Sequence, residues 1–209
     1  MNPDLLVKSL AAIEPKSTVE KFREVSGIAG KPLAKSVLDF LVSNDIGVIT
    51  NNKIEFSGSD RLNAGMLALR MGCDIERVSA QLSWKDFEKL ASEVLASCGY
   101  KTQTNVHLTK PRMEIDVVGV SSGLAIAVDC KHWKTSTISS LTSFSIKQSA
   151  RAMRLPNWDA TVRCAVPVLM TLHGESVKFA NRIPIVPVHK FKSFVIDVKG
   201  FLPEVYVAD

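Results

Sequence analysis

The chain has 209 residues, a net charge of +5, and ordinary hydrophobic and charged fractions of 46% and 22%. This length allows one large domain or two small ones, each with its own core. No uninterrupted apolar run approaches the ~20 residues that span a bilayer, and the start lacks the apolar core of a signal peptide. We therefore expect a cytoplasmic protein with no membrane partner. The four cysteines show no CxxC spacing, which argues against a zinc or disulfide framework.

The positive charge is concentrated in the C-terminal part. Residues 1–82 contain ten Lys/Arg and ten Asp/Glu, whereas residues 83–209 contain sixteen and eleven. An excess of this size suits a polyanionic partner but is weak evidence by itself.

The N-terminal part reads as helices followed by a hairpin. Helix-period apolar residues predict helices over residues 3–15, 18–28 and 31–47, with Ser17 capping the second and Gly30 ending it. Two β-like runs around Asn51-Asn52 predict a hairpin over residues 48–58. This order resembles that of a winged helix-turn-helix, with residues 31–43 as recognition helix and 50–53 as wing. We expect residues 1–82 to form this domain with its connecting helices, which either docks on DNA or serves in packing or dimerisation.

The pattern changes at Ser83, a candidate helix cap. A helix is predicted over residues 83–100, then strands over 101–109, 114–120 and 124–133, a helix over 138–155, a strand over 161–172 and a short helix over 175–182. This alternation predicts an α/β domain over residues 83–209, with a mixed central sheet flanked by helices.

Three charged residues interrupt the apolar strands of this domain. Asp116 lies within a Val/Ile run, and Asp129 and Lys131 share a face near the end of the next strand. Two carboxylates on neighbouring strands repel each other unless a cation lies between them. Such a pair is a fitting shell for Mg²⁺, which keeps water ligands and activates water at a phosphodiester. The alternative is a buried Asp116–Lys131 ion pair that only joins the strands.

The spacing of Asp116 and the Asp129-Cys130-Lys131 triplet resembles the PD-(D/E)xK pattern of the restriction-endonuclease-like nucleases. The preceding helix, with Phe87-Glu88 and Gly99-Tyr100, resembles the first helix of the Mrr-like restriction endonucleases and archaeal Holliday-junction resolvases. The resemblance implies a restriction-endonuclease-like core and a Mg²⁺-dependent endodeoxyribonuclease, with Mn²⁺ as a substitute.

In those families a helix glutamate reaches the metal site. The resemblance therefore implies that Glu88, Asp116 and Asp129 bind the metal and that Lys131 assists the attacking water. Glu93 is the alternative helix ligand, and Glu114 shares the strand face of Asp116.

Six further residues are candidates for nucleic-acid binding. Lys147, Arg151 and Arg154 are spaced to line one helix face, which either grips phosphates or is simply solvated. The other three are Lys110, Arg112 and Gln148; Gln148 loosely matches a polar residue that related nucleases carry near the site.

The expected partner is DNA, as a duplex, branched or modified, and a homodimer would cut both strands. Two other functions stay open: a DNA-binding module with an inactive nuclease fold, and a nuclease for structured RNA. No motif selects the substrate among these.

Overall fold

The computed structural model describes all residues except 16, 51–52, 110, 132–136 and 175–176. The chain forms two compact units, Met1–Asp86 and Phe87–Asp209. Within the described ranges, no helix combines the length and apolar character needed to cross a membrane.

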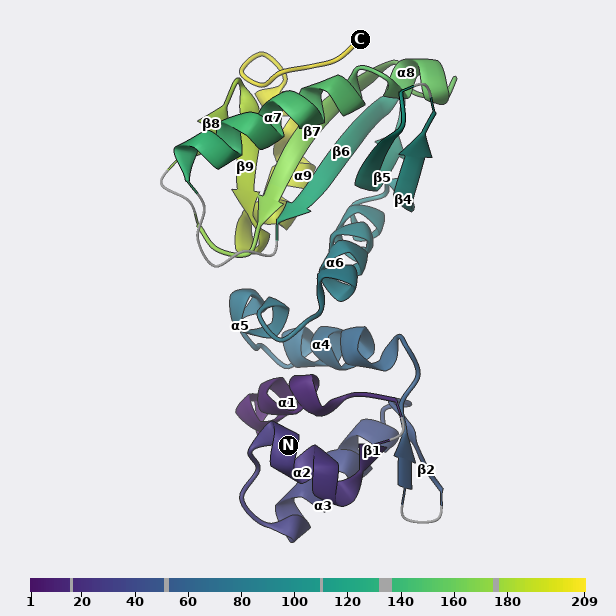
Figure 1. Cartoon of the computed structure of the whole chain (residues 1–209), viewed down its shortest axis with the longest axis vertical. Coiled ribbons are helices and arrows are strands. Elements are labelled where there is room, and N and C mark those ends of the chain that lie inside the picture. Colours follow the sequence, from purple (N-terminus) through teal and green to yellow (C-terminus); the bar gives the residue numbers. More distant parts are fainter. Residues whose placement is uncertain (16, 51–52, 110, 132–136, 175–176) are drawn as a thin grey trace. The chain divides into compact units, whose positions relative to one another are not determined.

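The first unit is mainly helical (Figure 1). Its elements are α1 (Pro3–Ser9), η1 (Leu10–Ala12), β1 (Ser17–Thr18), α2 (Val19–Ser26), α3 (Lys31–Val42), β2 (Val48–Thr50), β3 (Lys53–Glu55), α4 (Asp60–Arg70) and α5 (Ile75–Ser79). The three strands form an antiparallel sheet in the order β1-β3-β2. The sequence predicted the three helices and the hairpin, but not the short strand β1.

The ends of α2 differ from the prediction. Thr18, not Ser17, caps the helix, and its side chain accepts a hydrogen bond from the Lys21 amide at 3.2 Å. Ser17 instead pairs with Ile54 in the sheet. The helix ends at Gly27, whose φ of 64° is the left-handed conformation that glycine adopts without strain. Gly30 lies at the start of α3 instead.

The core of the first unit includes the apolar face of α3. Its buried residues Ala34, Val37, Leu38 and Leu41 recur at helical spacing. The predicted turn of the hairpin, Asn51-Asn52, lies outside the described residues. The winged-helix interpretation and its wing therefore stay predictions.

The second unit is built on a six-stranded sheet. Its elements are α6 (Trp84–Ser97), β4 (Lys101–Leu108), β5 (Met113–Ser121), β6 (Leu124–Lys131), α7 (Ile138–Ala152), α8 (Leu155–Trp158), β7 (Cys164–Thr171), β8 (Phe179–Ala180), β9 (Ile183–Pro187) and α9 (Val188–Phe201). The side chain of Ser83 accepts a hydrogen bond from the Asp86 amide at 3.2 Å, as expected of a helix cap. Residues 179–180 form β8, so the predicted helix over 175–182 is wrong there.

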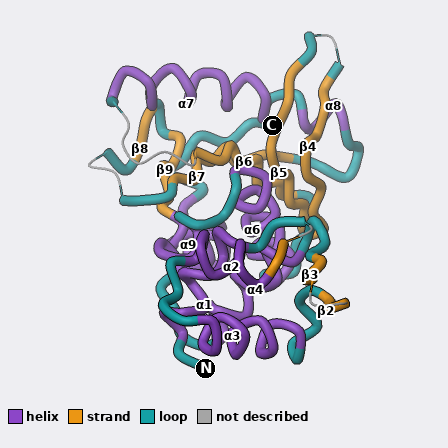
Figure 2. Tube along the Cα trace, turned by 60° about the horizontal axis from the view of Figure 1, so that its bottom comes forward, coloured by secondary structure: helices purple, strands orange, loops and turns teal. Residues whose placement is uncertain are grey.

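The sheet is mixed and covered on both faces. Its order is β4-β5-β6-β7-β9-β8; β4, β5 and β6 are antiparallel, β7 and β9 run parallel to β6, and β8 is antiparallel to β9. Figure 2 shows α7 on one side of the strands and α6 and α9 on the other. The predicted α/β class, with a mixed sheet flanked by helices, is confirmed.

Helix α6 packs closely on the sheet at Gly119. A Cβ atom built on Gly119 would lie 3.1 Å from a methyl carbon of Leu95 and 3.2 Å from the Cβ of Tyr100. A larger residue would therefore require Leu95 or Tyr100 to give way by a few tenths of an ångström. Gly119 thus fixes how near α6 lies to the sheet.

Strands β5 and β6 are joined by a two-residue turn. Ser122 and Gly123 both have positive φ, 51° and 84°, which matches a turn that follows the twist of the strands. At the sheet edge, β4 contains another residue of positive φ, Asn105 at 52°, and its pairing with β5 skips this position.

Candidate active site

Two carboxylates face each other across β5 and β6. Val117 pairs with Val128, so one step further along the antiparallel ladder Asp116 lies opposite Asp129. Asp116 Oδ2 accepts a hydrogen bond from the backbone amide of Cys130 at 2.7 Å. The predicted approach of the two aspartates is therefore seen in the structure. The hairpin register brings them together from positions thirteen residues apart.

Asp129 is nearly buried and contacts two cationic side chains, those of Lys131 and Arg151. Its Oδ2 lies 2.7 Å from Lys131 Nζ, an ion pair without the alignment of a hydrogen bond, and its Oδ1 accepts from Arg151 Nη1 at 3.0 Å. Arg151 Nη1 also donates to Gln148 Oε1 at 3.0 Å, and Gln148 Nε2 donates to the carbonyl of Ala127 at 2.9 Å. A chain of hydrogen bonds therefore connects α7 with β6 at the carboxylate.

The proximity of the carboxylates changes the protonation of Asp116. Burial, followed by the charge of Asp129, raises the pKa of Asp116 from 3.8 to about 6, although the hydrogen bond from Cys130 opposes this shift. A proton on Asp116 relieves the repulsion, and so would a metal cation.

The thiol of Cys130 belongs to the opposite face of β6, because neighbouring side chains of a strand alternate. Burial raises its pKa well above the ordinary value, with smaller contributions from the charges of Asp116 and Glu88. The thiol is therefore protonated at neutral pH and offers no thiolate to a metal.

The two candidate glutamates of α6 differ in their surroundings. Glu88 is 5% exposed, and its charge acts on the thiol of Cys130 at the end of β6. Glu93 is exposed to solvent. Of these two, Glu88 is the one whose carboxylate lies within electrostatic reach of the paired strands.

The donor set fits a small, hard cation. Within the described ranges, no group of three His, Cys, Asp or Glu side chains forms a metal cluster. Mg²⁺ needs only one or two protein carboxylates, because it retains most of its water ligands. Asp116 and Asp129 provide two carboxylates whose mutual repulsion a cation would relieve.

The structure separates the candidate nucleic-acid residues. Lys147 and Arg112 are exposed, whereas Gln148 is fully buried and Arg151 turns inward to Asp129. Arg154 is partly buried at the start of α8. Lys110 lies outside the described residues. The spacing of Lys147, Arg151 and Arg154 had suggested one solvated stripe. The structure does not show such a stripe, because Arg151 turns inward.

Sequence reasoning missed Phe144 at this site. Lys131 Nζ lies 4.3 Å from the centre of the Phe144 ring, within the range of a cation–π contact. Phe144 precedes Gln148 by one helical turn, so both lie on the face of α7 that contacts β6. That spacing was the available signal in the sequence.

The comparisons with known proteins concern mainly the segment that carries this site. Residues 79–157, which carry α6, the β5–β6 hairpin and α7, match the family model of the Mrr catalytic domain, described as a restriction endonuclease. An uncharacterized protein of Archaeoglobus fulgidus is 26% identical over 127 residues, which are 59% of this chain and 97% of that protein.

Among solved structures, a Vibrio cholerae protein matches 97% of this chain with 12% identity and a TM-score of 0.43. The chain spans about half the length of that protein. The family match bears out the sequence resemblance to the nucleases: residues 79–157 are similar to the Mrr-like restriction endonucleases of the PD-(D/E)xK superfamily.

Proposed function

We propose that the chain is a metal-dependent endonuclease that hydrolyses phosphodiester bonds of DNA. The observation that carries the proposal is the register of β5 and β6, with Asp116 opposite Asp129 and Lys131 paired to Asp129 at 2.7 Å. All three residues lie within the segment that matches the restriction-endonuclease family model, which supports the proposal. The net positive charge of residues 83–209 suits a polyanionic substrate.

Each residue of the site has a distinct task in this proposal. Asp116 and Asp129 would hold Mg²⁺, or Mn²⁺ in its place, and Glu88 is the proposed contribution of α6. The bound cation supplies a Lewis acid and lowers the pKa of its water. Lys131 orients the attacking water and stabilises negative charge on the reacting phosphate. Asp116 must lose its proton before it can serve as a ligand, because a neutral acid binds a cation weakly.

Supporting residues position this group. Gln148 fixes α7 to the backbone of β6, and Arg151 orients Asp129. Both are positioning residues, since they act through Asp129 and β6 and not on the phosphate. Lys147, Arg112, Arg154 and Lys110 are proposed to contact the DNA backbone, which fixes position but not sequence.

The test is a cleavage panel with Mg²⁺ or Mn²⁺: duplex, modified duplex, flap, four-way junction, single strand and RNA. We expect cleavage of at least one DNA substrate, and Asp116→Asn and Asp129→Asn should each remove it. Asp197→Asn, which alters an exposed carboxylate of α9, is the matched control and should cut normally. Equal cutting by all three variants would show that these carboxylates are not catalytic.

A second function is favoured by the ion pairs of Asp129. Both carboxylate oxygens already contact a cation, Lys131 or Arg151, so the group is neutralised without metal. A DNA-binding module that keeps an inactive nuclease fold would have this property. Such a protein would bind DNA with strong salt dependence and cut none of the panel.

A further inference from the structure

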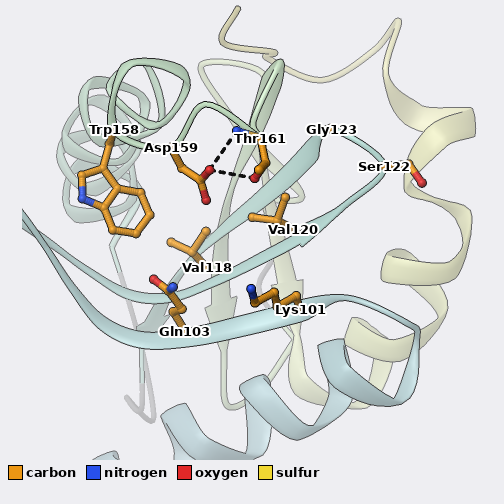
Figure 3. A pocket seen from close by; sticks show the side chains of 9 residues that line it. All are labelled: Lys101, Gln103, Val118, Val120, Ser122, Gly123, Trp158, Asp159 and Thr161. Atoms are coloured by element: carbon orange, nitrogen blue, oxygen red, sulfur yellow. Dashed lines mark hydrogen bonds between the residues drawn. The ribbon is translucent and has the colours of Figure 1, made fainter.

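A cavity of about 400 Å³ lies in the second unit, at the other end of β5 from the carboxylates. Figure 3 shows its walls: Val118 and Val120 form the floor, Gln103 and Lys101 lie beside them on β4, and Trp158 and Asp159 close the opposite side. We call this cavity the Trp158 pocket. Its volume is in the range of sites for small molecules.

The walls combine an aromatic plane with an apolar floor. Trp158 is the last residue of α8 and is 40% exposed, which is unusual for the largest apolar side chain. Val118 and Gln103 are cross-strand neighbours, and so are Val120 and Lys101, so all four share one face of the sheet. A flat ring could therefore lie against Trp158 with polar groups at its edges.

Asp159 is a fixed acceptor in this pocket. Its Oδ1 accepts from both the amide and the hydroxyl of Thr161, at 2.8 and 2.7 Å. The hydrogen bond from the Thr161 hydroxyl, followed by that from the amide, lowers the pKa of Asp159, so the carboxylate is charged at neutral pH. The turn thus sets the carboxylate in place before any ligand arrives, which reduces the entropy lost on binding.

The rim of the pocket is also fixed. Arg163 Nη2 donates to the carbonyl of Ser122 at 2.8 Å, and the Arg163 amide donates to the carbonyl of Gly123 at 2.8 Å. The guanidinium lies so close to Gly123 that a Cβ there would clash with it. The β5–β6 turn is therefore tied to the segment that leads into β7.

The pocket lies on the same strand face as the proposed active site. Asp116, Val118 and Val120 alternate along β5, so the floor begins about 7 Å from Asp116 and ends about 13 Å from it, at roughly 3.3 Å per residue. This distance corresponds to about two to four steps of stacked duplex DNA, at ~3.4 Å per step.

We propose that the Trp158 pocket binds a single unstacked nucleobase that carries an exocyclic amino group. The base stacks on Trp158, its amino group donates to Asp159, and Gln103 completes the hydrogen bonds at the ring edge. Lys101 lies where it can contact a phosphate. Adenine, cytosine and guanine have the amino group. Thymine lacks it, and the two carbonyl oxygens that flank its N3–H are repelled by the carboxylate. The proposal rests on the proposed function only in taking nucleic acid as the polymer.

The test uses the full chain and the four deoxynucleoside monophosphates. Each is titrated to about 10 mM, well above a weak dissociation constant near 1 mM, while NMR follows the indole and amide signals. We expect dAMP, dCMP and dGMP to shift the signals of Trp158 and Gln103, and dTMP to bind about tenfold more weakly, the value of one hydrogen bond to a charged group. Absence of any shift, or equal binding of all four, overturns the proposal.

Two variants locate the binding. Asp159→Asn keeps an acceptor for Thr161 but loses the charge, so it should reduce the preference over dTMP. Trp158→Leu should weaken all four nucleotides, whereas Trp84→Leu, at an exposed tryptophan elsewhere, should change none. Unchanged affinity in both pocket variants overturns the proposal.

The results separate this pocket from the nuclease proposal. A chain that cuts DNA but binds no monophosphate refutes the pocket and leaves the nuclease. One that binds amino-bearing nucleotides but cuts no substrate supports the pocket and refutes the nuclease.

Discussion

The guanidinium of Arg151 and the carboxylate of Asp129 form an ion pair at 3.0 Å in which the Asp129 side chain is only 3% exposed. The pair joins α7 to the end of β6 at the point where a metal ligand is proposed. A cation that binds Asp129 must therefore share the carboxylate with Arg151 or displace it. This competition can be measured.

The first prediction concerns Arg151→Met. Loss of the guanidinium leaves Asp129 with Lys131 as its cation, so the folded state should lose about 1–3 kcal/mol without divalent metal. Mg²⁺ should then raise the Tm of this variant more than that of the unaltered chain, because it replaces the missing charge. Thermal unfolding with EDTA or with Mg²⁺ measures both effects. Arg151→Lys is the matched control, and equal Mg²⁺ responses in all three proteins would contradict the prediction.

The second prediction concerns the pH dependence of stability. The pKa of Asp116 is raised from 3.8 to about 6, so the folded protein holds this proton more tightly than the unfolded chain. The resulting stabilisation is present below about pH 3.8 and is lost as the pH rises through 6, by up to about 3 kcal/mol. Asp116→Asn imitates the neutral acid and should be more stable than the unaltered chain at pH 7.

Urea unfolding with EDTA at pH 4 and pH 7 measures this difference. The free energy of unfolding of Asp116→Asn should exceed that of the unaltered chain by little at pH 4 and by much more at pH 7. The contributions of other titrating groups cancel in this difference because both proteins contain them. The same difference at both pH values would mean that Asp116 does not titrate in this window.

The third prediction separates the two glutamates of α6. Glu88→Gln should lower the cleavage rate about 10²–10³-fold, as expected on loss of a charged group at the site, while Glu93→Gln should leave it unchanged because that side chain is exposed. Single-turnover cleavage measures the rate, and DNA binding of both variants serves as the control. If Glu93→Gln lowered the cleavage rate and Glu88→Gln did not, the helix ligand would be Glu93.

The fourth prediction tests the packing of α6 on β5. Gly119→Ala places a methyl group 3.1 Å from Leu95 and should destabilise the protein by about 1–3 kcal/mol. Gly200→Ala, in α9 with nothing within 4 Å of its new Cβ, should be neutral or slightly stabilising. Chemical denaturation measures both. The double variant Gly119→Ala, Leu95→Ala should lose less than the sum of its single variants.

The sequence was sufficient to predict the strands that carry the site. Asp116 and Asp129 stand out because each interrupts an apolar run, and the two-residue turn at Ser122-Gly123 sets the register that brings them opposite. Local pattern and turn chemistry determine both features. The Mrr-like resemblance predicted the family of this segment for the same reason, since its motifs are local.

The features that the sequence did not reveal depend on tertiary contacts. Helical spacing put Lys147, Arg151 and Arg154 on one face, but it could not show that Arg151 turns to Asp129. The cap of α2 is Thr18 and not Ser17, and both residues pair with β3, which is far away in the chain. The Trp158 pocket combines side chains from β4, β5, the end of α8 and the segment after it, which no single stretch of sequence brings together.

Asn105 has a consequence for association between molecules. β4 is hydrogen-bonded to β5 alone, so its other side is an edge that could pair with a strand of another copy. The positive φ of Asn105 breaks the regular alternation of donors and acceptors halfway along this edge. An incoming strand could follow β4 for only half its length. The conformation of Asn105 therefore limits how far another molecule could extend the sheet at the β4 edge.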